Sequence, residues 1–380
     1  DSPYVHLAKL VEEIRVGFLE SKAKKSAKVM SELEASLVAL KSLVERPIDS
    51  KAKPLGLVVC GAVPVLSEIA CCSFEVPELS RAAGTASEVL DLGIRGIQGF
   101  GLNLLKSAIF PKILVALDNT TLEEREHACV LPLLRVARGC INSAPLDSPR
   151  RSQVIDFILH SAMIEKLQLR MKLGQQGIRS PTTPHAMDSV KLNMLLDEAA
   201  IGFIVSITNS SPDRSVCDPP IQTHLVENIR PLLAGMPSLL LSLLLTNARN
   251  SPTSGNRPQS PSSPIASLLP FGPLPGSELS PKRAPMSESA LRLVQAGLRL
   301  LNNMAQSNLV ALQAVFAPKD LALELYHLLA FVLHSADCGN ESHPALTEAI
   351  LLVGYLALNS PSLRELFRWG SAPSILQMLC

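Results

Sequence analysis

The feature that most constrains the fold is an internal repeat near the end of the chain. The segments 312–329 and 363–380 match in apolar pattern at an offset of 51 residues. The superimposed apolar positions are Leu312 with Leu363, Phe316 with Phe367 and Leu325 with Leu376. The match continues upstream, where Asn308 falls on Asn359. Because self-similarity at a fixed period is the signature of stacked repeats, the sequence predicts two consecutive structural units of one kind.

Each unit follows the armadillo pattern, in which a long apolar helix ends in an Asn-capped turn, a second helix follows, and a small-residue turn opens the next apolar helix. Weaker copies of this pattern occur at 60–72, 131–145 and 198–212, so we expect five or six units of irregular length. A stack of such units is stabilised by contacts between neighbours and offers a long concave groove to partners. The predicted fold is therefore an all-α, armadillo/HEAT-like right-handed superhelical solenoid.

Composition and proline placement support this prediction. The chain has 380 residues, of which 47% are hydrophobic and only 4% aromatic, a balance that favours helices packed through aliphatic side chains. Most of the 29 prolines fall between apolar segments, which predicts many short helices joined by turns. We expect helical repeats over 1–246, a Pro/Ser-rich disordered loop over 247–289, a shorter loop over 174–189, and repeats over 290–380 that continue the same solenoid.

The formal net charge is only +1, so any nucleic-acid contact must be local. The densest basic run places Lys22, Lys24, Lys25 and Lys28 on a helical segment that could touch ribosomal RNA phosphates. A solvated helix face explains the run equally well and is the preferred interpretation, because no aromatic residues are interleaved. The most apolar window, 232–245, contains Pro237 and is shorter than the roughly 20 residues of a membrane span, so we expect no membrane insertion.

The sequence offers no catalytic, metal or cofactor motif. It lacks GxxxxGK[ST], HExxH, GxSxG and CxxC patterns, and its eight cysteines are expected to be reduced core thiols of a cytosolic protein. Gly93, Gly96, Gly99 and Gly101 have the wrong spacing for a nucleotide loop and indicate close helix packing instead. We therefore expect neither an enzyme nor a metal or cofactor site.

Two kinds of cell-cycle motif remain. Ser148 and Ser280 each begin a Ser-Pro-x-basic pattern typical of cyclin-dependent kinase substrates, and both are candidate phosphorylation sites. The segment 364–367 matches the RxLF pattern of cyclin docking. However, Leu366 and Phe367 fall on repeat positions occupied by Val315 and Phe316, so a core role is the preferred interpretation.

The last quarter of the chain, in particular ALRLVQAGLRLLNNMA, EAILLVGYLALNSP and GSAPSILQMLC, resembles the C-terminal region of the family of S phase cyclin A-associated protein in the endoplasmic reticulum. The residues that match the expected signature of this family are Gly370, Pro373, Leu376, Gln377, Leu379 and Cys380. The chain opens at Asp1 without methionine and is expected to be a piece of a longer protein.

The resemblance implies a cytoplasmic adaptor, at the ribosome or at the cytosolic face of the endoplasmic reticulum. Such an adaptor links a tetratricopeptide-repeat tubulin-specificity factor to the deadenylase complex, and thereby triggers decay of tubulin mRNA (tubulin autoregulation). The alternative is a cyclin A/Cdk-binding scaffold in cell-cycle regulation. No partner-binding residue of the family can be carried onto numbered positions of this chain.

Overall fold

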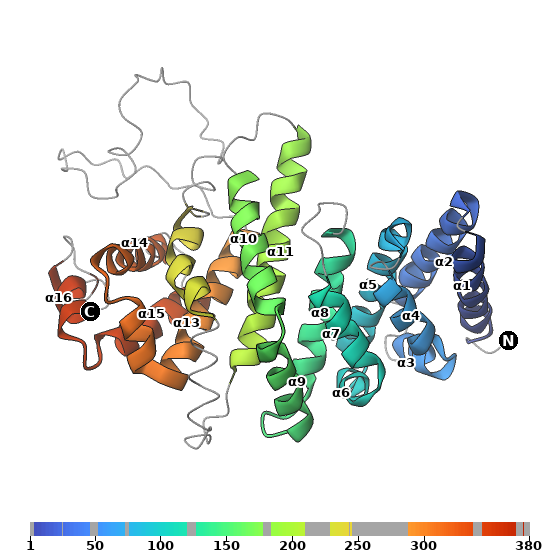
Figure 1. Cartoon of the computed structure of the whole chain (residues 1–380), viewed down its shortest axis with the longest axis horizontal. Helices are drawn as coiled ribbons and strands as arrows, with labels where there is room; N and C mark the ends of the chain where they lie inside the picture. Colours follow the sequence, from blue (N-terminus) through green and yellow to red (C-terminus); the bar gives the residue numbers. More distant parts are fainter. Residues whose placement is uncertain are drawn as a thin grey trace. The chain divides into compact units, whose positions relative to one another are not determined.

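The computed structural model describes most of the chain, and every element in the described part is helical. The described residues are 4–24, 26–45, 52–72, 76–119, 127–177, 184–209, 229–242, 244, 288–336, 344–369 and 375. No strand occurs among these residues, as the sequence predicts. The chain divides into two compact units, residues 1–211 and residues 212–380. Figure 1 shows the helices of each unit, labelled in sequence order.

The first unit begins with two long helices and continues with shorter ones. Its elements are α1 (Val5–Lys24), α2 (Ala27–Glu45), α3 (Ala52–Val59), α4 (Ala62–Cys71), the 3-10 helix η2 (Pro77–Leu79), α5 (Ser80–Gly96), α6 (Phe100–Lys106), α7 (Ile109–Asp118), α8 (His127–Ser143), α9 (Pro149–His160), α10 (Met163–Gly177) and α11 (Pro184–Thr208). In α2 the apolar residues Leu33, Leu37, Leu40 and Val44 recur at helical spacing, and all four are buried. Burying each such side chain contributes roughly 1.5 to 3 kcal/mol, which holds α2 against its neighbours.

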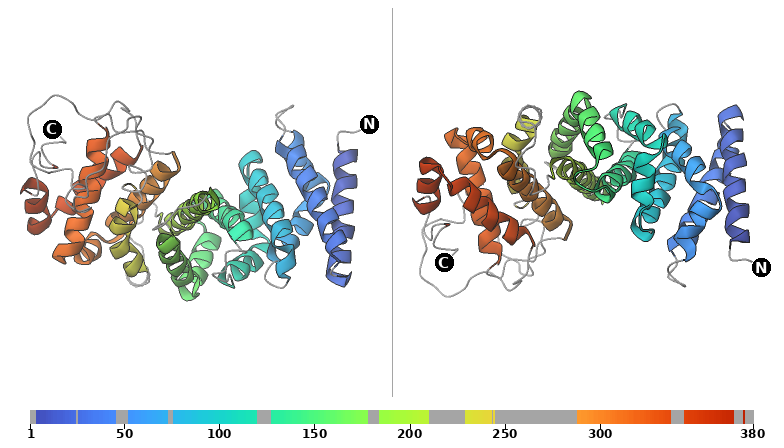
Figure 2. Two further views of the ribbon diagram at one scale, coloured as in Figure 1. Left: turned by 90° about the horizontal axis from the view of Figure 1, so that it is seen from above. Right: turned by 90° about the horizontal axis from the view of Figure 1, so that it is seen from below.

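The helices of the first unit pack in a regular series. Helix α1 lies against α2, as both views of Figure 2 show, and α2 packs against α5, α5 against α8, and α8 against α11. Two further α-helices precede each of α5, α8 and α11 in the sequence. The described helices α3–α5, α6–α8 and α9–α11 thus form groups of three. The third helix of each group contacts the third helix of the next group.

Several prolines mark helix boundaries, as the sequence predicts. Pro149, Pro184, Pro344 and Pro361 are each the first residue of a helix, where the missing N–H would have no intrahelical partner and the fixed φ suits the helix. Pro132 is an exception to the predicted placement of prolines between helices, because it lies inside α8. Burial of α8 on several neighbours offsets the lost backbone hydrogen bond, so the helix continues through the proline.

The glycine run 93–101 spans the end of α5 and the start of α6. Helix α5 ends at Gly96, and Gly99 adopts a left-handed conformation with φ of 80° at the start of α6. The predicted close packing holds at Gly93, where a Cβ would lie 3.1 Å from the Phe100 ring. Gly101 is likewise held against Ser143 of α8. These glycines therefore serve a tight helix junction.

The second unit contains the predicted repeat. Its elements are the helix Ile229–Ser242, α13 (Glu288–Val315), α14 (Lys319–Ala336), α15 (Pro344–Ala357) and α16 (Pro361–Trp369). Helix α13 is broken at Asn308, whose Oδ1 accepts a hydrogen bond of 3.0 Å from the Ala311 N–H and so caps the following turns. The equivalent Asn359 has a left-handed φ of 55° between α15 and α16. The paired positions Leu312, Leu363, Phe316 and Phe367 are all buried, while Leu376 lies outside the described residues.

The predicted segment limits shift in detail. Helix α10 extends to Gly177 and α11 begins at Pro184, so most of the predicted loop 174–189 is helical. Helix α13 begins at Glu288, two residues inside the predicted loop 247–289, whose residues up to 287 lie outside the described part. The continuation of one solenoid through that segment stays a prediction.

Candidate protein-binding groove

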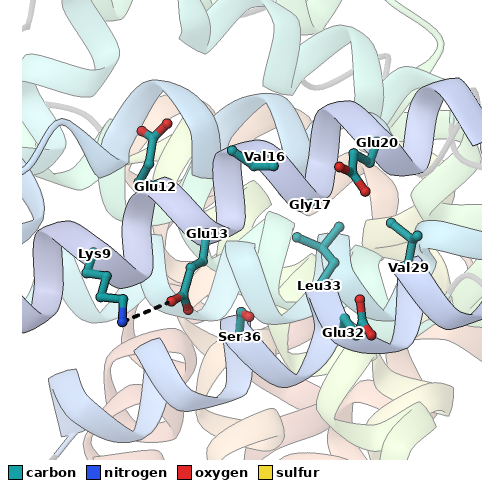
Figure 3. A pocket seen from close by; sticks show the side chains of 10 residues that line it. All are labelled: Lys9, Glu12, Glu13, Val16, Gly17, Glu20, Val29, Glu32, Leu33 and Ser36. Atoms are coloured by element: carbon teal, nitrogen blue, oxygen red, sulfur yellow. Dashed lines mark ion pairs between the residues drawn. The ribbon is translucent and has the colours of Figure 1, made fainter.

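A concavity of the first unit runs between α1 and α2. It has a volume of about 530 Å³ and is open to solvent. Its lining residues are Lys9, Glu12, Glu13, Val16, Gly17, Glu20, Val29, Glu32, Leu33 and Ser36. Figure 3 shows these side chains along the two helices, with Gly17 and Leu33 between the acidic groups. We call this the α1–α2 groove.

The floor of the α1–α2 groove is apolar. Leu33 is buried, Val29 is half-buried, and Val16 has 46% of its surface exposed. Gly17 lies beside them in the middle of α1, and a Cβ at this position would sit 3.7 Å from Leu33 Cδ1. That distance is an ordinary van der Waals contact, so packing does not require glycine here.

The rim of the α1–α2 groove is acidic. Glu12, Glu13, Glu20 and Glu32 face one lining cation, Lys9, which gives the lining residues a formal charge of −3. Lys9 Nζ lies 4.0 Å from Glu13 Oε1, and Lys28 Nζ lies 3.9 Å from Glu32 Oε1, so both ion pairs are long. Arg15 donates to Glu12 at 2.7 Å, and this bond raises the pKa of the guanidinium. All these groups are largely exposed, so water screens their charges and partners can reach them.

The three described lysines of the predicted basic run lie on helices, but on two helices and not on one. Helix α1 ends at Lys24 and α2 begins at Ala27, so the lysine run spans the turn, and Lys25 lies outside the described residues. Lys22 Nζ stacks 4.6 Å from the centre of the Phe18 ring, and Lys24 and Lys28 are exposed. Lysines in the last turn of α1 are favoured by the helix dipole, which accounts for this ending of the helix. RNA contact by these lysines stays a prediction.

The cyclin-docking pattern 364–367 lies on α16. Phe367 is fully buried, as the core interpretation expects, and Leu366 is half-buried. Arg364 donates to the Ala357 carbonyl, at 3.2 Å from Nη2, and thereby joins the start of α16 to the end of α15. A docking motif needs its Leu and Phe side chains accessible, so this geometry favours a structural role for the segment.

The kinase pattern at Ser148 is partly incorporated into the folded first unit. Ser148 is half-buried and precedes α9, and its carbonyl accepts the Ser152 N–H at 3.1 Å. The basic residue of the pattern, Arg151, is buried and donates 2.7 Å from its Nη2 to the Ser206 carbonyl of α11. A kinase that reads Arg151 would have to displace it from α11. Ser280 lies outside the described residues, and both phosphorylations stay predictions.

Sequence reasoning missed a set of buried polar groups around α11. Besides Arg151 from α9, Arg170 from α10 and Asp197 of α11 are almost fully buried. Burial raises the pKa of Asp197 to about 8, and the nearby Arg170 opposes this shift. The sequence did carry a signal for these groups, namely charged residues within apolar runs. Aliphatic helical repeats seldom bury such charged residues unless they have partners.

The described residues were also expected to include core cysteines and no metal site or membrane span. Cys72, Cys129 and Cys140 are buried, in keeping with core thiols, whereas Cys60 and Cys71 are only half-buried. The described residues contain no cluster of three or more His, Cys, Asp or Glu side chains that could hold a metal ion. Within the described part, no helix by itself has both the length and the hydropathy of a membrane span. Helices α6 and α7 reach those criteria only when taken together, and they meet at a bend of 81°.

The described part of the chain is all-helical and built from packed helices, and its first unit carries the open α1–α2 groove. No known family pattern matches the chain. The chain is similar to the human (Homo sapiens) S phase cyclin A-associated protein in the endoplasmic reticulum, with 31% identity over 105 residues. This alignment covers 27% of the chain and 7% of that relative's length. The similarity agrees with the resemblance seen in the sequence and extends over a short part of a much longer protein.

Proposed function

We propose that this chain is a non-enzymatic, protein-binding adaptor built on an armadillo/HEAT-like right-handed solenoid. The packing series α2, α5, α8 and α11 supports the solenoid, because it repeats every three α-helices, as armadillo units do. The matched positions of Asn308 and Asn359 support the same repeat in the second unit. Solenoids of this kind present extended surfaces to partner proteins.

The observation that carries the proposal is the α1–α2 groove, an open concavity with an apolar floor and a charged rim. Protein-binding sites combine these two features, since apolar contact supplies affinity and charged rims guide association. The surface ion pairs of the rim are exposed and suit recognition of another charged surface.

A photo-crosslinking experiment tests the proposal. A photoreactive phenylalanine analogue is placed at Val16, in the groove, and in a matched variant at Val38, which is 52% exposed on α2 outside the groove. We expect protein adducts in cells from position 16 in clear excess over position 38. Equal or absent adduct formation at position 16 would contradict a protein-binding role for the groove.

The finer assignment rests on the family resemblance. We propose that the partners are a tetratricopeptide-repeat tubulin-specificity factor and the deadenylase complex, met at the ribosome in the cytoplasm or at the cytosolic face of the endoplasmic reticulum. Tubulin mRNA should then become insensitive to excess free tubulin in cells that lack the protein and regain its response on re-expression. An unchanged response in those cells would reject this assignment.

The alternative is a cyclin A/Cdk-binding scaffold, which the name of the human relative suggests for that relative. Buried Phe367 argues against binding through 364–367 in the folded chain. Co-precipitation of cyclin A with the chain would favour the alternative, provided that substitution of surface residues outside 364–367 abolishes it.

A further inference from the structure

We propose that the α1–α2 groove binds a cationic amphipathic segment of a partner protein. In this arrangement a partner apolar side chain sits over Gly17, and partner Lys or Arg side chains meet the rim carboxylates. The inference rests on the proposed protein-binding function and specifies the chemistry of its occupant.

The first argument is the glycine in the floor. Gly17 is in the interior of a helix of 20 residues, where glycine is among the least favourable residues. Other glycines of the first unit are explained by packing: a Cβ at Gly93 would lie 3.1 Å from Phe100, and one at Gly139 would lie 2.9 Å from Ile94. At Gly17 the corresponding distance to Leu33 is a comfortable 3.7 Å. Packing leaves this glycine unexplained, and what its missing side chain provides is an open floor beside Val16.

The second argument is the charge of the rim. The lining residues carry a formal charge of −3, and no ion pair of Glu20 occurs among the described residues. Lys9 and Lys28 have side chains that are 76% and 85% exposed and hold their partners only at 4.0 and 3.9 Å. Such loose pairs are easily replaced by basic groups of a partner. Arg15 already holds Glu12, so Glu13, Glu20 and Glu32 are the carboxylates open to a partner, and they favour a cationic over an acidic protein segment.

The third argument is size. A volume of about 530 Å³ accommodates a few side chains of one short segment and not a folded domain. The groove runs along two packed helices, and amphipathic helices commonly dock into sites of this shape through apolar anchors at helical spacing. The apolar floor and acidic rim therefore match one face of a Lys/Leu-type amphipathic helix.

The test uses the full chain and two labelled helical peptides of equal length, one built from Leu and Lys and one from Leu and Glu. Fluorescence anisotropy should detect binding of the Leu/Lys peptide and little or none of the Leu/Glu peptide. Gly17→Leu, which fills the floor, should weaken binding roughly tenfold, as the loss of one central contact does. Glu13→Gln combined with Glu20→Gln should weaken binding and flatten its salt dependence.

Matched controls separate the groove from general charge attraction. Val38→Leu adds an aliphatic group outside the groove, and Glu68→Gln with Glu165→Gln removes two exposed carboxylates from other helices. Both controls should bind the Leu/Lys peptide like the parent chain. Gly17→Ala covers the case in which Gly17→Leu fails to fold, because it should raise the thermal midpoint and still lower affinity.

Three results would overturn the inference: equal binding of the two peptides, parent-like binding by folded Gly17 variants, or equal losses in the groove and control carboxylate variants. If crosslinks form at position 16 and any of these results is obtained, the groove binds protein but its occupant is not cationic. If no crosslinks form but the peptide binds specifically in the groove, the proposed protein-binding function in cells is rejected. The preference of the groove for a cationic amphipathic segment is then still supported.

Discussion

Gln313 Nε2 lies 2.5 Å from the Leu358 carbonyl oxygen, and this contact joins the two repeats of the second unit. Gln313 belongs to the last turns of α13, whereas Leu358 directly follows α15. The same amide nitrogen lies 3.3 Å from the Leu356 carbonyl oxygen and 3.4 Å from that of Tyr355. The two N–H groups of this amide thus serve carbonyls at the end of α15, where a helix leaves acceptors without intrahelical partners.

Gln313→Ala should lower the free energy of unfolding by about 1 kcal/mol, because it removes a partly buried cap shared between repeats. Gln306→Ala is the matched control, since Gln306 makes only an exposed bond of 3.3 Å to the Tyr355 hydroxyl. The control should change stability by a few tenths of a kcal/mol at most. Urea unfolding of both variants measures the difference, and equal stabilities would show that Gln313 does not couple the repeats.

The cyclin-docking pattern yields a second prediction. Phe367→Ala should cost about 3 to 5 kcal/mol, because it empties a fully buried core position. Leu366→Ala should cost less, about 1 kcal/mol, since Leu366 is only half-buried. The sequence repeat alone predicts equal, large losses for both residues, and the structure corrects this. A Phe367→Ala chain as stable as the parent that had lost cyclin A binding would instead support exposed docking.

The buried position of Phe367 could be predicted from the sequence, whereas the half-buried position of Leu366 could not. Phe367 could be placed in the core because Phe316 occupies the equivalent position 51 residues earlier. Equivalent positions of stacked repeats are usually buried alike. Leu366 could not, because Val315 at the equivalent repeat position is buried whereas Leu366 is only half-buried, and this difference arises from packing that the repeat pattern does not encode. The helical class and the Asn turns follow from local pattern and capping chemistry, which depend on a few adjacent residues.

The groove and the buried polar groups depend on tertiary contacts that no local pattern encodes. Gly17 belongs to α1 and Leu33 to α2. Whether a Cβ at Gly17 would fit therefore depends on how these two helices pack. Arg151 and Ser206 are likewise brought together by the packing of α9 near α11. The sequence predicts one helical segment for the basic run, whereas α1 ends at Lys24 and α2 begins at Ala27, and helical periodicity alone does not locate so short a break.

The lysine run gives a third prediction. Replacing Lys22, Lys24, Lys25 and Lys28 by Glu should weaken ribosome co-sedimentation and flatten its salt dependence, because phosphate contacts release counterions. Helicity should persist, since Glu and Lys have similar helix propensities. Lys106→Glu with Lys112→Glu is a control at exposed positions elsewhere in the first unit. Unaltered co-sedimentation across a salt series would assign the run to an ordinary solvated turn.

The last prediction concerns the pH dependence of stability at Asp197. The folded chain raises the pKa of this carboxyl from 3.8 to about 8, first because burial disfavours the charged form, with Arg170 acting in the opposite direction. Between these two values the unfolded chain has released the proton while the folded chain keeps it. The unfolded state therefore binds fewer protons, and the contribution of Asp197 to stability falls as pH rises from about 4 to about 8.

Asp197→Asn removes this titration, because an amide stays neutral at every pH in the window. Relative to the parent, the variant should gain stability with rising pH, by at most about 1.4 kcal/mol for each pH unit. Glu198→Gln, at the adjacent half-buried position, is the control and should follow the parent. Urea unfolding at pH 5, 6, 7 and 8 gives the difference between the curves. If the Asp197→Asn and parent curves run parallel, the Arg170 charge holds the carboxylate ionised throughout, and the pair is a buried salt bridge instead of a protonated acid beside a cation.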